Sequence, residues 1–137
     1  DEGKGELNVT CENLDMLSNS ATLCRFALMS MSITDLADAL KVTTGFDYDL
    51  NEIMECGDRI WMLLRGLNNL MGVTAADDRM PKRIMTPHTE GGAAGSVPNV
   101  ELMIKDYYKA RGLDANGRPL KEKLNSLGLS DLAGKLH

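Results

Sequence analysis

The chain has 137 residues, of which 43% are hydrophobic and 26% charged, as expected of one globular domain with its own core. Its net charge of −5 argues against binding nucleic acid or an anionic membrane surface, because both need clustered Lys and Arg. No apolar run approaches the roughly 18 residues of a membrane span. The chain has three cysteines, Cys11, Cys24 and Cys56, and this odd count argues against a disulfide scaffold and favours a reduced, cytoplasmic setting. They form no Cys-x-x-Cys pair, so the chain has no complete zinc or iron–sulfur motif.

The N-terminal third predicts short helices separated by polar breaks. Residues 1–6 are Gly-rich and charged, as is typical of a linker. A loosely periodic helix is expected over residues 7–18, followed by a second apolar stretch over 23–31. Residues 32–35, Ser-Ile-Thr-Asp, have the pattern of a capping box in front of a short helix. Gly45 is suited to the left-handed position that ends this helix.

The strongest secondary-structure signal covers residues 49–71. Asp49 and Glu52 form a second capping-box pattern. Apolar residues then recur at the 3, 4, 7 spacing of one helical face. Gly57 lies in the middle of this run, where glycine costs roughly 1 kcal/mol relative to alanine. We therefore expect one long helix, with another backbone packed closely at Gly57.

The C-terminal half begins with a loop and ends in helices. Residues 73–99 carry three prolines and a Gly-rich run, and are expected to form an irregular loop. Residues 100–111 predict a helix, and a last helix is expected from Pro119 to Gly128. No segment alternates as a strand would. Residues 1–137 are therefore predicted to be a single all-α domain, irregular and multi-helical, with one long amphipathic helix and a Pro/Gly-rich loop.

Several short motifs follow one another in the order and spacing of a known family. They are Gly3–Leu7, Thr44–Asp47, Cys56–Trp61, Asn68–Asn69, Asp77–Arg83, Tyr107–Gly112 and Gly117–Leu129. Together they resemble the C-terminal region of the aldehyde:ferredoxin oxidoreductases. The resemblance implies the last helical domain of a larger tungsten or molybdenum enzyme, which oxidises aldehydes to carboxylic acids. The catalytic acid and base of that family would lie outside this chain, so no catalytic residue is assigned here.

One family motif, Asp-x-x-Gly-Leu-Cys, resembles the run from Asn19 to Cys24. The resemblance implies that this run binds one pterin of a bis-pterin tungsten cofactor, and that Cys24 is the fourth ligand of a 4Fe-4S cluster. Leu23 and Cys24 match the pattern. Asn19 replaces the carboxylate, although its amide oxygen can still accept a hydrogen bond. Thr22 replaces the glycine and would be strained if this position has a positive φ.

The resemblance also implies partners: the N-terminal and middle domains of the same enzyme, and ferredoxin as electron acceptor. The isolated chain is expected to hold no cofactor, to be inactive, and to expose an interface through which it can self-associate. Two alternatives remain open. One is a non-catalytic helical interaction module that keeps the fold, which the replacements at Asn19 and Thr22 favour. The other is a domain of a related aromatic acyl-thioester reductase subunit.

Without the resemblance, Cys24 would be interpreted as a small buried hydrophobe. As a cluster ligand it should instead lie near a helix end, beside apolar groups exposed for a partner, supplied by Met16, Leu17, Leu23, Phe26 and Leu28. Cys11 and Cys56 have no motif that supports a ligand role, and are expected in the core or on a helix surface. Trp61 is expected to be a packing residue, and His88 an exposed loop residue without a metal.

Overall fold

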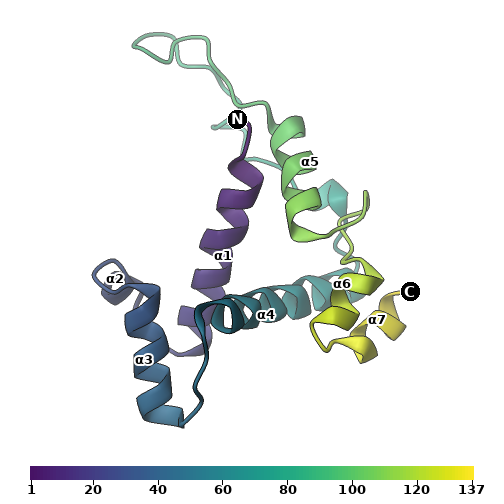
Figure 1. The fold of residues 1–137 in the computed structure, drawn as a ribbon. Helices are drawn as coiled ribbons and strands as arrows, with labels where there is room; N and C mark the ends of the chain where they lie inside the picture. Colours follow the sequence, from purple (N-terminus) through teal and green to yellow (C-terminus); the bar gives the residue numbers. More distant parts are fainter.

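The computed structural model describes residues 1–137 as an all-α chain, which confirms the predicted fold class (Figure 1). It contains no β-strand, only two isolated β-bridges. Its helices are α1 (Lys4–Ser20), α2 (Arg25–Leu28), α3 (Ile33–Thr44), α4 (Leu50–Leu70), η1 (Ala75–Asp77, a 3-10 turn), α5 (Val100–Arg111), α6 (Lys121–Ser126) and α7 (Ser130–Leu136). None of them combines the length and the apolar character needed to cross a membrane.

Helix α1 holds the fold together, because both α4 and α5 pack against it (Figure 1). Two glycines permit these close approaches. A Cβ added at Gly57 of α4 would overlap the main-chain carbonyl of Asn13 in α1. A Cβ at Gly5 of α1 would lie 2.5 Å from the backbone nitrogen of Tyr107 in α5. The expected close packing at Gly57 is therefore confirmed.

The apolar core is divided between the two ends of α4. The larger cluster joins α4 to the C-terminal third of the chain, and comprises Met62, Tyr108, Leu113, Leu124, Leu127, Leu132 and Ala133. The smaller one joins α1, α3 and α4 through Leu17, Leu36 and Ile53. Side chains of these sizes each contribute about 1.5–3 kcal/mol when fully buried. The two clusters therefore fix α4 as the bridge of the domain.

Arg111 is fully buried where α1, α4 and α5 meet. Its guanidinium donates to Asn13 Oδ1 at 2.5 Å, to Asp58 Oδ1 at 3.0 Å and to Glu12 Oε2 at 2.6 Å. It also lies over the ring of Trp61, 4.3 Å from the ring centre. The carboxylates of Asp58 and Glu12 offset the desolvation cost of burying the guanidinium. Because these partners lie on α1 and α4, Arg111 of α5 connects the three helices. The packing role expected for Trp61 is confirmed.

Both predicted capping boxes are present. The Asp49 side chain accepts hydrogen bonds from the first turn of α4, and Glu52 Oε2 accepts one from the Asp49 backbone at 2.9 Å. Ser32 and Asp35 make the same reciprocal pair at the start of α3. Gly45 ends α3 with a φ of 80°. The expected long helix over residues 49–71 is observed as α4, Leu50–Leu70.

The start of α1, the length of α2, the start of α6 and the presence of α7 differ from the sequence-based expectation. Helix α1 already begins at Lys4, so the linker-like segment predicted over residues 1–6 is reduced to residues 1–3. The apolar stretch over 23–31 forms only the four-residue α2. At the C-terminus, α6 begins at Lys121 rather than Pro119, and the chain continues beyond Gly128 into a further helix, α7.

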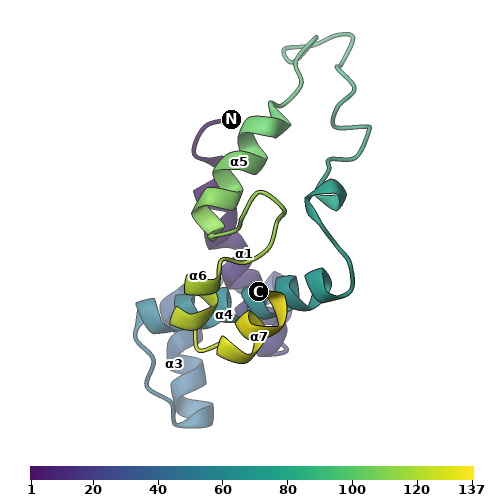
Figure 2. The same cartoon turned by 90° about the vertical axis from the view of Figure 1, so that its right-hand side faces the viewer.

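The segment between α4 and α5 extends away from the helices as a long loop (Figures 1 and 2). Within residues 73–99, the only helical piece is the turn η1. The tip is closed by its own backbone, where Gly95 N–H donates to the carbonyl of His88 at 2.9 Å. His88 is exposed, and no group of three or more His, Cys, Asp or Glu in the chain could hold a metal ion.

Candidate functional site

The segment from Asn19 to Cys24 comprises the last two residues of α1 and the turn that joins α1 to α2. Leu23 N–H donates to the carbonyl of Ser18 at 2.9 Å, which folds the turn back onto the end of α1. Within it, Thr22 has a φ of 56° and is the only residue other than glycine with a positive φ. A β-branched side chain is strained in this region. This is the conformation that the glycine of the family pattern would adopt without cost.

Cys24 is exposed at the N-terminal boundary of α2. Its predicted position at a helix end is therefore confirmed, and the alternative of a buried hydrophobe is wrong. Phe26 and Met29 beside it are 79% and 81% exposed, whereas Leu23 and Leu28 pack against the smaller core cluster. Leu17 belongs to that cluster and is 5% exposed, so its expected place on an exposed face is wrong.

The surface around Cys24 also carries charge. Arg25 follows the cysteine directly and forms an ion pair with Asp15 of α1. Asn19, at the other end of the turn, is exposed. Cys24 and Asn19 are therefore both accessible from outside the domain.

The residues present fit a shared cofactor site better than a complete one. Cys24 offers one accessible thiol, while a 4Fe-4S cluster takes four ligands, usually thiolates. Cys11 is exposed on α1, and Cys56 is half-buried beside the smaller core cluster. The turn is thus suited to supply a single ligand and one wall, with the other ligands coming from outside these residues.

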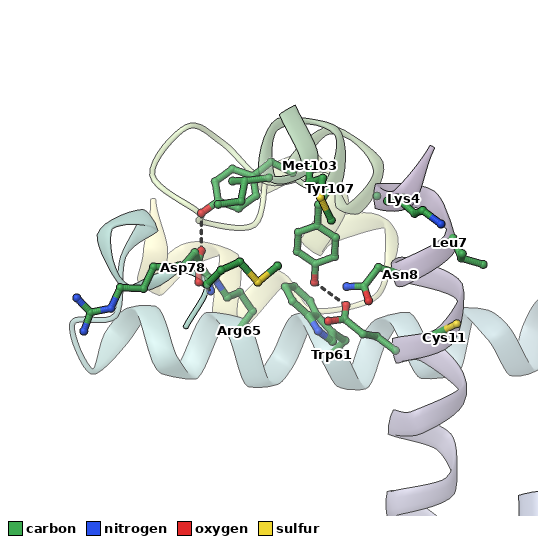
Figure 3. A pocket seen from close by; sticks show the side chains of 15 residues that line it. Lys4, Leu7, Asn8, Cys11, Trp61, Arg65, Asp78, Met103 and Tyr107 are labelled. Atoms are coloured by element: carbon green, nitrogen blue, oxygen red, sulfur yellow. Dashed lines mark hydrogen bonds and ion pairs between the residues drawn. The ribbon is translucent and has the colours of Figure 1, made fainter. Parts of the chain in front are cut away.

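A second candidate site, which the sequence analysis did not identify, is a cavity of about 550 Å3 between α1, α4 and α5 (Figure 3). Apolar and aromatic side chains of all three helices line it, among them Leu7, Trp61, Met103 and Ile104. Its rim carries Lys4, Asn8, Cys11 and Arg79. A cavity of this size and mixed lining is typical of a small-molecule pocket or of a seat for another protein segment.

Tyr107 forms one wall of the cavity through a bond to α1. Its hydroxyl donates to Glu12 Oε2 at 2.5 Å, and the same oxygen accepts from Arg111. Burial, and then the neighbouring Glu12 carboxylate, raise the pKa of Tyr107 well above its usual value. The phenol therefore stays protonated and keeps donating to Glu12.

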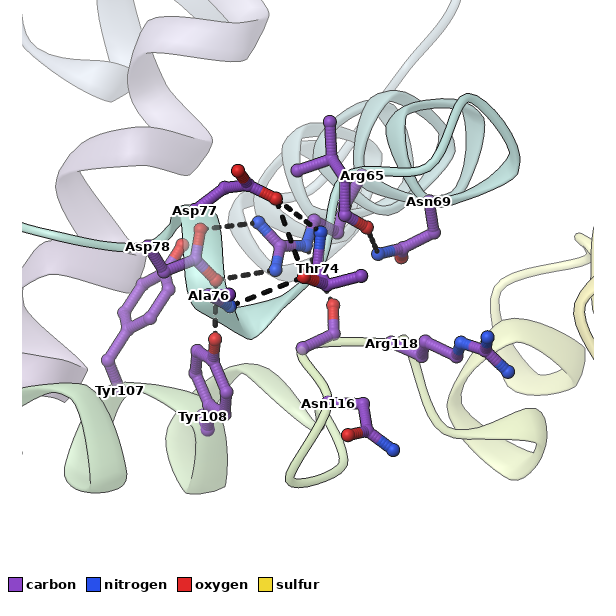
Figure 4. A network of polar contacts seen from close by, with 12 residues as sticks. Arg65, Asn69, Thr74, Ala76, Asp77, Asp78, Tyr107, Tyr108, Asn116 and Arg118 are labelled. Carbon is purple, nitrogen blue, oxygen red and sulfur yellow. Dashed lines mark hydrogen bonds and ion pairs between the residues drawn. The ribbon is translucent and has the colours of Figure 1, made fainter.

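The opposite wall is fixed by an ion pair (Figure 4). Arg65 of α4 binds both carboxylate oxygens of Asp78, at 2.8 and 2.5 Å, and its Nε donates to the carbonyl of Gly117 at 2.7 Å. The Tyr108 hydroxyl also donates to Asp78. These bonds join the loop after η1 to two helices and to the turn at Gly117.

The hydrogen bond between Asp78 and Tyr108 shifts the pKa of both side chains. Burial acts to raise the pKa of Asp78, but the hydrogen bonds from Arg65 and Tyr108 outweigh it and hold this pKa below its ordinary value. Burial, followed by the hydrogen bond to Asp78, raises the pKa of Tyr108 to about 12. At neutral pH the carboxylate is charged and the phenol is neutral, as the hydrogen-bond pattern requires. The arrangement is a rigid support, with no free acid or base.

Several residues that line this cavity lie in the family-like runs of the sequence. Asp78 lies in one of the family-like runs, and the adjacent Tyr107 and Tyr108 lie in another. Nothing in the spacing indicates that the two tyrosines face different carboxylates, one in α1 and one after η1. That pairing depends on how α5 crosses α1.

Comparison with known proteins places this all-α chain with its exposed cysteine turn among oxidoreductase domains. Residues 1–129 match the sequence model of "Aldehyde ferredoxin oxidoreductase, domains 2 & 3". The chain therefore belongs to the aldehyde ferredoxin oxidoreductase family. It is 33% identical, over 95% of its length, to the tungsten-containing aldehyde ferredoxin oxidoreductase of Pyrococcus furiosus, and 32% identical, over 93%, to that of Thermococcus kodakarensis.

A further relative is named for a different activity. The WOR-like subunit of an aliphatic sulfonate oxidoreductase from Pyrococcus furiosus is 30% identical over 89% of the chain. In each comparison the chain covers only about a fifth of the relative's length: 22% of the two aldehyde enzymes and 21% of the sulfonate enzyme. These 137 residues thus correspond to one part of a much longer enzyme.

Proposed function

We propose that the chain is the C-terminal helical domain of a cytoplasmic tungsten-dependent aldehyde:ferredoxin oxidoreductase. In this proposal, Cys24 is one thiolate ligand of the 4Fe-4S cluster through which electrons pass to ferredoxin. Asn19, Thr22 and Leu23 form one wall of the site of a pterin that holds the tungsten. The tungsten centre supplies the two-electron oxidation of the aldehyde. The contribution of this chain is to hold and orient the cofactors and to exclude water on its side.

The observation that carries the proposal is the turn itself. It matches the family motif at Leu23 and Cys24, and Thr22 has the positive φ that a glycine would favour. Strained backbone of this kind persists where the surrounding structure maintains it, often at functional sites. The exposed thiol of Cys24 is accessible to a group held by another domain.

The test uses the full-length polypeptide that contains these residues, purified without oxygen. We expect Cys24→Ser to remove or alter the electron paramagnetic resonance signal of the reduced 4Fe-4S cluster and to lower the bound iron. Aldehyde oxidation with ferredoxin as acceptor should fall at least 100-fold. The matched control is Cys11→Ser, because Cys11 is also an exposed, free cysteine. It should leave the signal and the iron content unchanged.

A wild-type cluster signal in Cys24→Ser would contradict the ligand assignment. The second candidate function, a non-catalytic interaction module, is favoured by the replacement of the motif carboxylate by Asn19 and of its glycine by Thr22. That function predicts a full-length protein with neither iron nor tungsten, whichever cysteine is changed. Metal analysis of the wild-type protein therefore separates the two functions before any variant is made.

A further inference from the structure

The C-terminal half of α4 has an apolar side that no other part of the chain covers. Six side chains form this surface, here called the outer α4 face: Ile60, Leu63, Leu64, Leu67, Leu70 and Met71. Five of them are exposed, and Met71 is 75% exposed. At 3.6 residues per turn, the six fall within an arc of about 120°. No charged residue of this half of the helix lies within that arc.

The side of the same helix half that adjoins this face is already packed. Met62 is completely buried in the larger core cluster. A Cβ added at Gly66 would overlap the side chain of Leu132 in α7. Together the two sides form an apolar arc of about 200°, roughly twice the width of the stripe with which a surface helix normally faces its core. Trp61, Arg65, Asn68 and Asn69 occupy the rest of this helix half, so the outer α4 face is apolar surface beyond what the core of this domain uses.

We propose that the outer α4 face is the docking surface for another domain of the same polypeptide, which lays an apolar face of its own against it. The proposal rests on the proposed function, since it takes the chain to be one part of the full enzyme. It adds to that function the surface through which the domains join. The face is separate from the turn at Cys24, so the two assignments can fail independently.

The size of the face favours a domain of the same chain over a second copy. Five exposed side chains and the half-buried Ile60 present on the order of 500 Å2, which is the size of the largest apolar patch on a typical monomer, and such a patch is often functional. A stable complex of separate proteins needs about 800 Å2 on each partner. A tethered domain needs less area, because the linker supplies a high effective concentration. The relatives also contain enough further chain to form the docked domain, since about four fifths of their length lies outside the region matched by this chain.

The decisive experiment is hydroxyl-radical footprinting of the full-length protein, read by mass spectrometry. The reference rate for each residue is that of the same residue in the unfolded protein. We expect Met71 and the leucines of the outer α4 face to be labelled at least tenfold more slowly in the folded protein. Labelling of Met71 at the unfolded rate would overturn the proposal.

A pair of variants tests the same surface by its energetics. Leu63→Ser with Leu67→Ser should speed proteolysis between the domains at least tenfold. The control pair, Val42→Ser with Leu120→Ser, removes two exposed apolar side chains from other elements and should leave the rate near that of the wild type. Equal rates in the two pairs would contradict the proposal. If the first pair does not fold, footprinting of the wild type still decides.

Two further readouts separate the possible failures. Protection of Met71 that disappears on dilution, together with a fall from dimer to monomer mass, would assign the face to a second copy and overturn the proposal. The cluster signal measured in the same wild-type sample reports on the proposed function. A cluster-containing protein with an exposed Met71 would overturn only the docking surface. A protected Met71 in a protein without a cluster would overturn only the cofactor assignment.

Discussion

The backbone conformation of Thr22 is the residue-level feature that links the turn to the family motif. It stands at a φ of 56° in a turn that the hydrogen bond from Leu23 N–H to the Ser18 carbonyl holds against the end of α1. An L-residue in the left-handed region costs about 1–2 kcal/mol. The chain retains this cost at the position where the family motif has glycine.

We expect Thr22→Gly to raise the free energy of unfolding by about 0.5–1 kcal/mol. Relief of the backbone strain outweighs the larger entropy of glycine in the unfolded chain. Urea unfolding followed by circular dichroism measures the change. Thr10→Gly, inside α1, should instead lower the stability, since glycine is a poor helix former. A loss of stability in Thr22→Gly would show that the turn is not strained.

The Tyr108–Asp78 pair predicts a loss of stability in alkali. The folded protein holds the pKa of Tyr108 at about 12, whereas an unfolded tyrosine titrates near pH 10. The folded state therefore binds this proton more tightly. Its contribution is complete below pH 10 and is lost as the pH rises from about 10 to 12.

Tyr108→Phe should accordingly flatten the fall in stability between pH 10 and 12. Urea unfolding at a series of pH values gives the slope, and Tyr48→Phe, which changes an exposed tyrosine, provides the comparison. The same slope in both variants would mean that Tyr108 does not contribute to the alkaline transition. The neutral-pH stability should also fall in Tyr108→Phe, because Asp78 loses a hydrogen bond.

At the scale of elements, the crossing of α1 and α4 depends on the absence of a side chain at Gly57. We expect Gly57→Ala to destabilise the domain by about 1–3 kcal/mol, since the new methyl group would collide with the backbone at Asn13 and force the helices apart. Thermal unfolding measures the change. The control, Gly134→Ala in α7, meets no atom within 4 Å and should be neutral or stabilising by about 0.5 kcal/mol. Equal effects would indicate that helix propensity alone matters at both sites.

The elements that the sequence predicts well are those determined by local chemistry. Helix α4 follows from its capping box and its apolar spacing, and α3 from Ser32, Asp35 and Gly45. The start of α1 was placed too late, because Gly5 is typical of a linker when considered alone. In the fold, Gly5 lies inside α1, where the backbone of Tyr107 packs so closely that a side chain would not fit. That tertiary contact has no local signal.

Helix α7 was missed for a related reason. Gly128, with a φ of 74°, does mark the end of one helix, as predicted. The chain then turns and begins α7, whose Leu132 fills the space left open by Gly66 in α4. Of the two candidate sites, likewise, only the one with a local motif could be predicted. The motif placed Cys24 at a helix end, whereas the cavity between α1, α4 and α5 depends on long-range pairings that spacing does not encode.

At the scale of the whole molecule, the domain exposes more apolar side chains than is usual for a protein that is stable as a monomer. The cysteine turn, the outer α4 face and the long loop between α4 and α5 all present exposed apolar side chains. Among these are Phe26, Met29, Leu67, Met71, Ile84 and Met85. Large uncovered apolar surfaces are rare on monomers and usually mark partner surfaces. In our proposal the other domains of the enzyme cover these surfaces, in line with a chain that spans about a fifth of the length of its relatives.

This dependence on other domains leads to a prediction for the isolated 137-residue chain. It should bind no iron–sulfur cluster and oxidise no aldehyde, because only Cys24 has the position expected of a ligand, and one thiolate cannot hold a 4Fe-4S cluster. Protein produced and purified without oxygen should lack the absorbance band near 400 nm that such clusters show, and contain no stoichiometric iron. In this chain Cys24 and Cys11 should react rapidly with a thiol reagent in the native state, and the half-buried Cys56 slowly. A stoichiometric cluster that protects Cys24 would mean that the chain assembles a complete site alone, with ligands contributed by several copies or by residues other than cysteine.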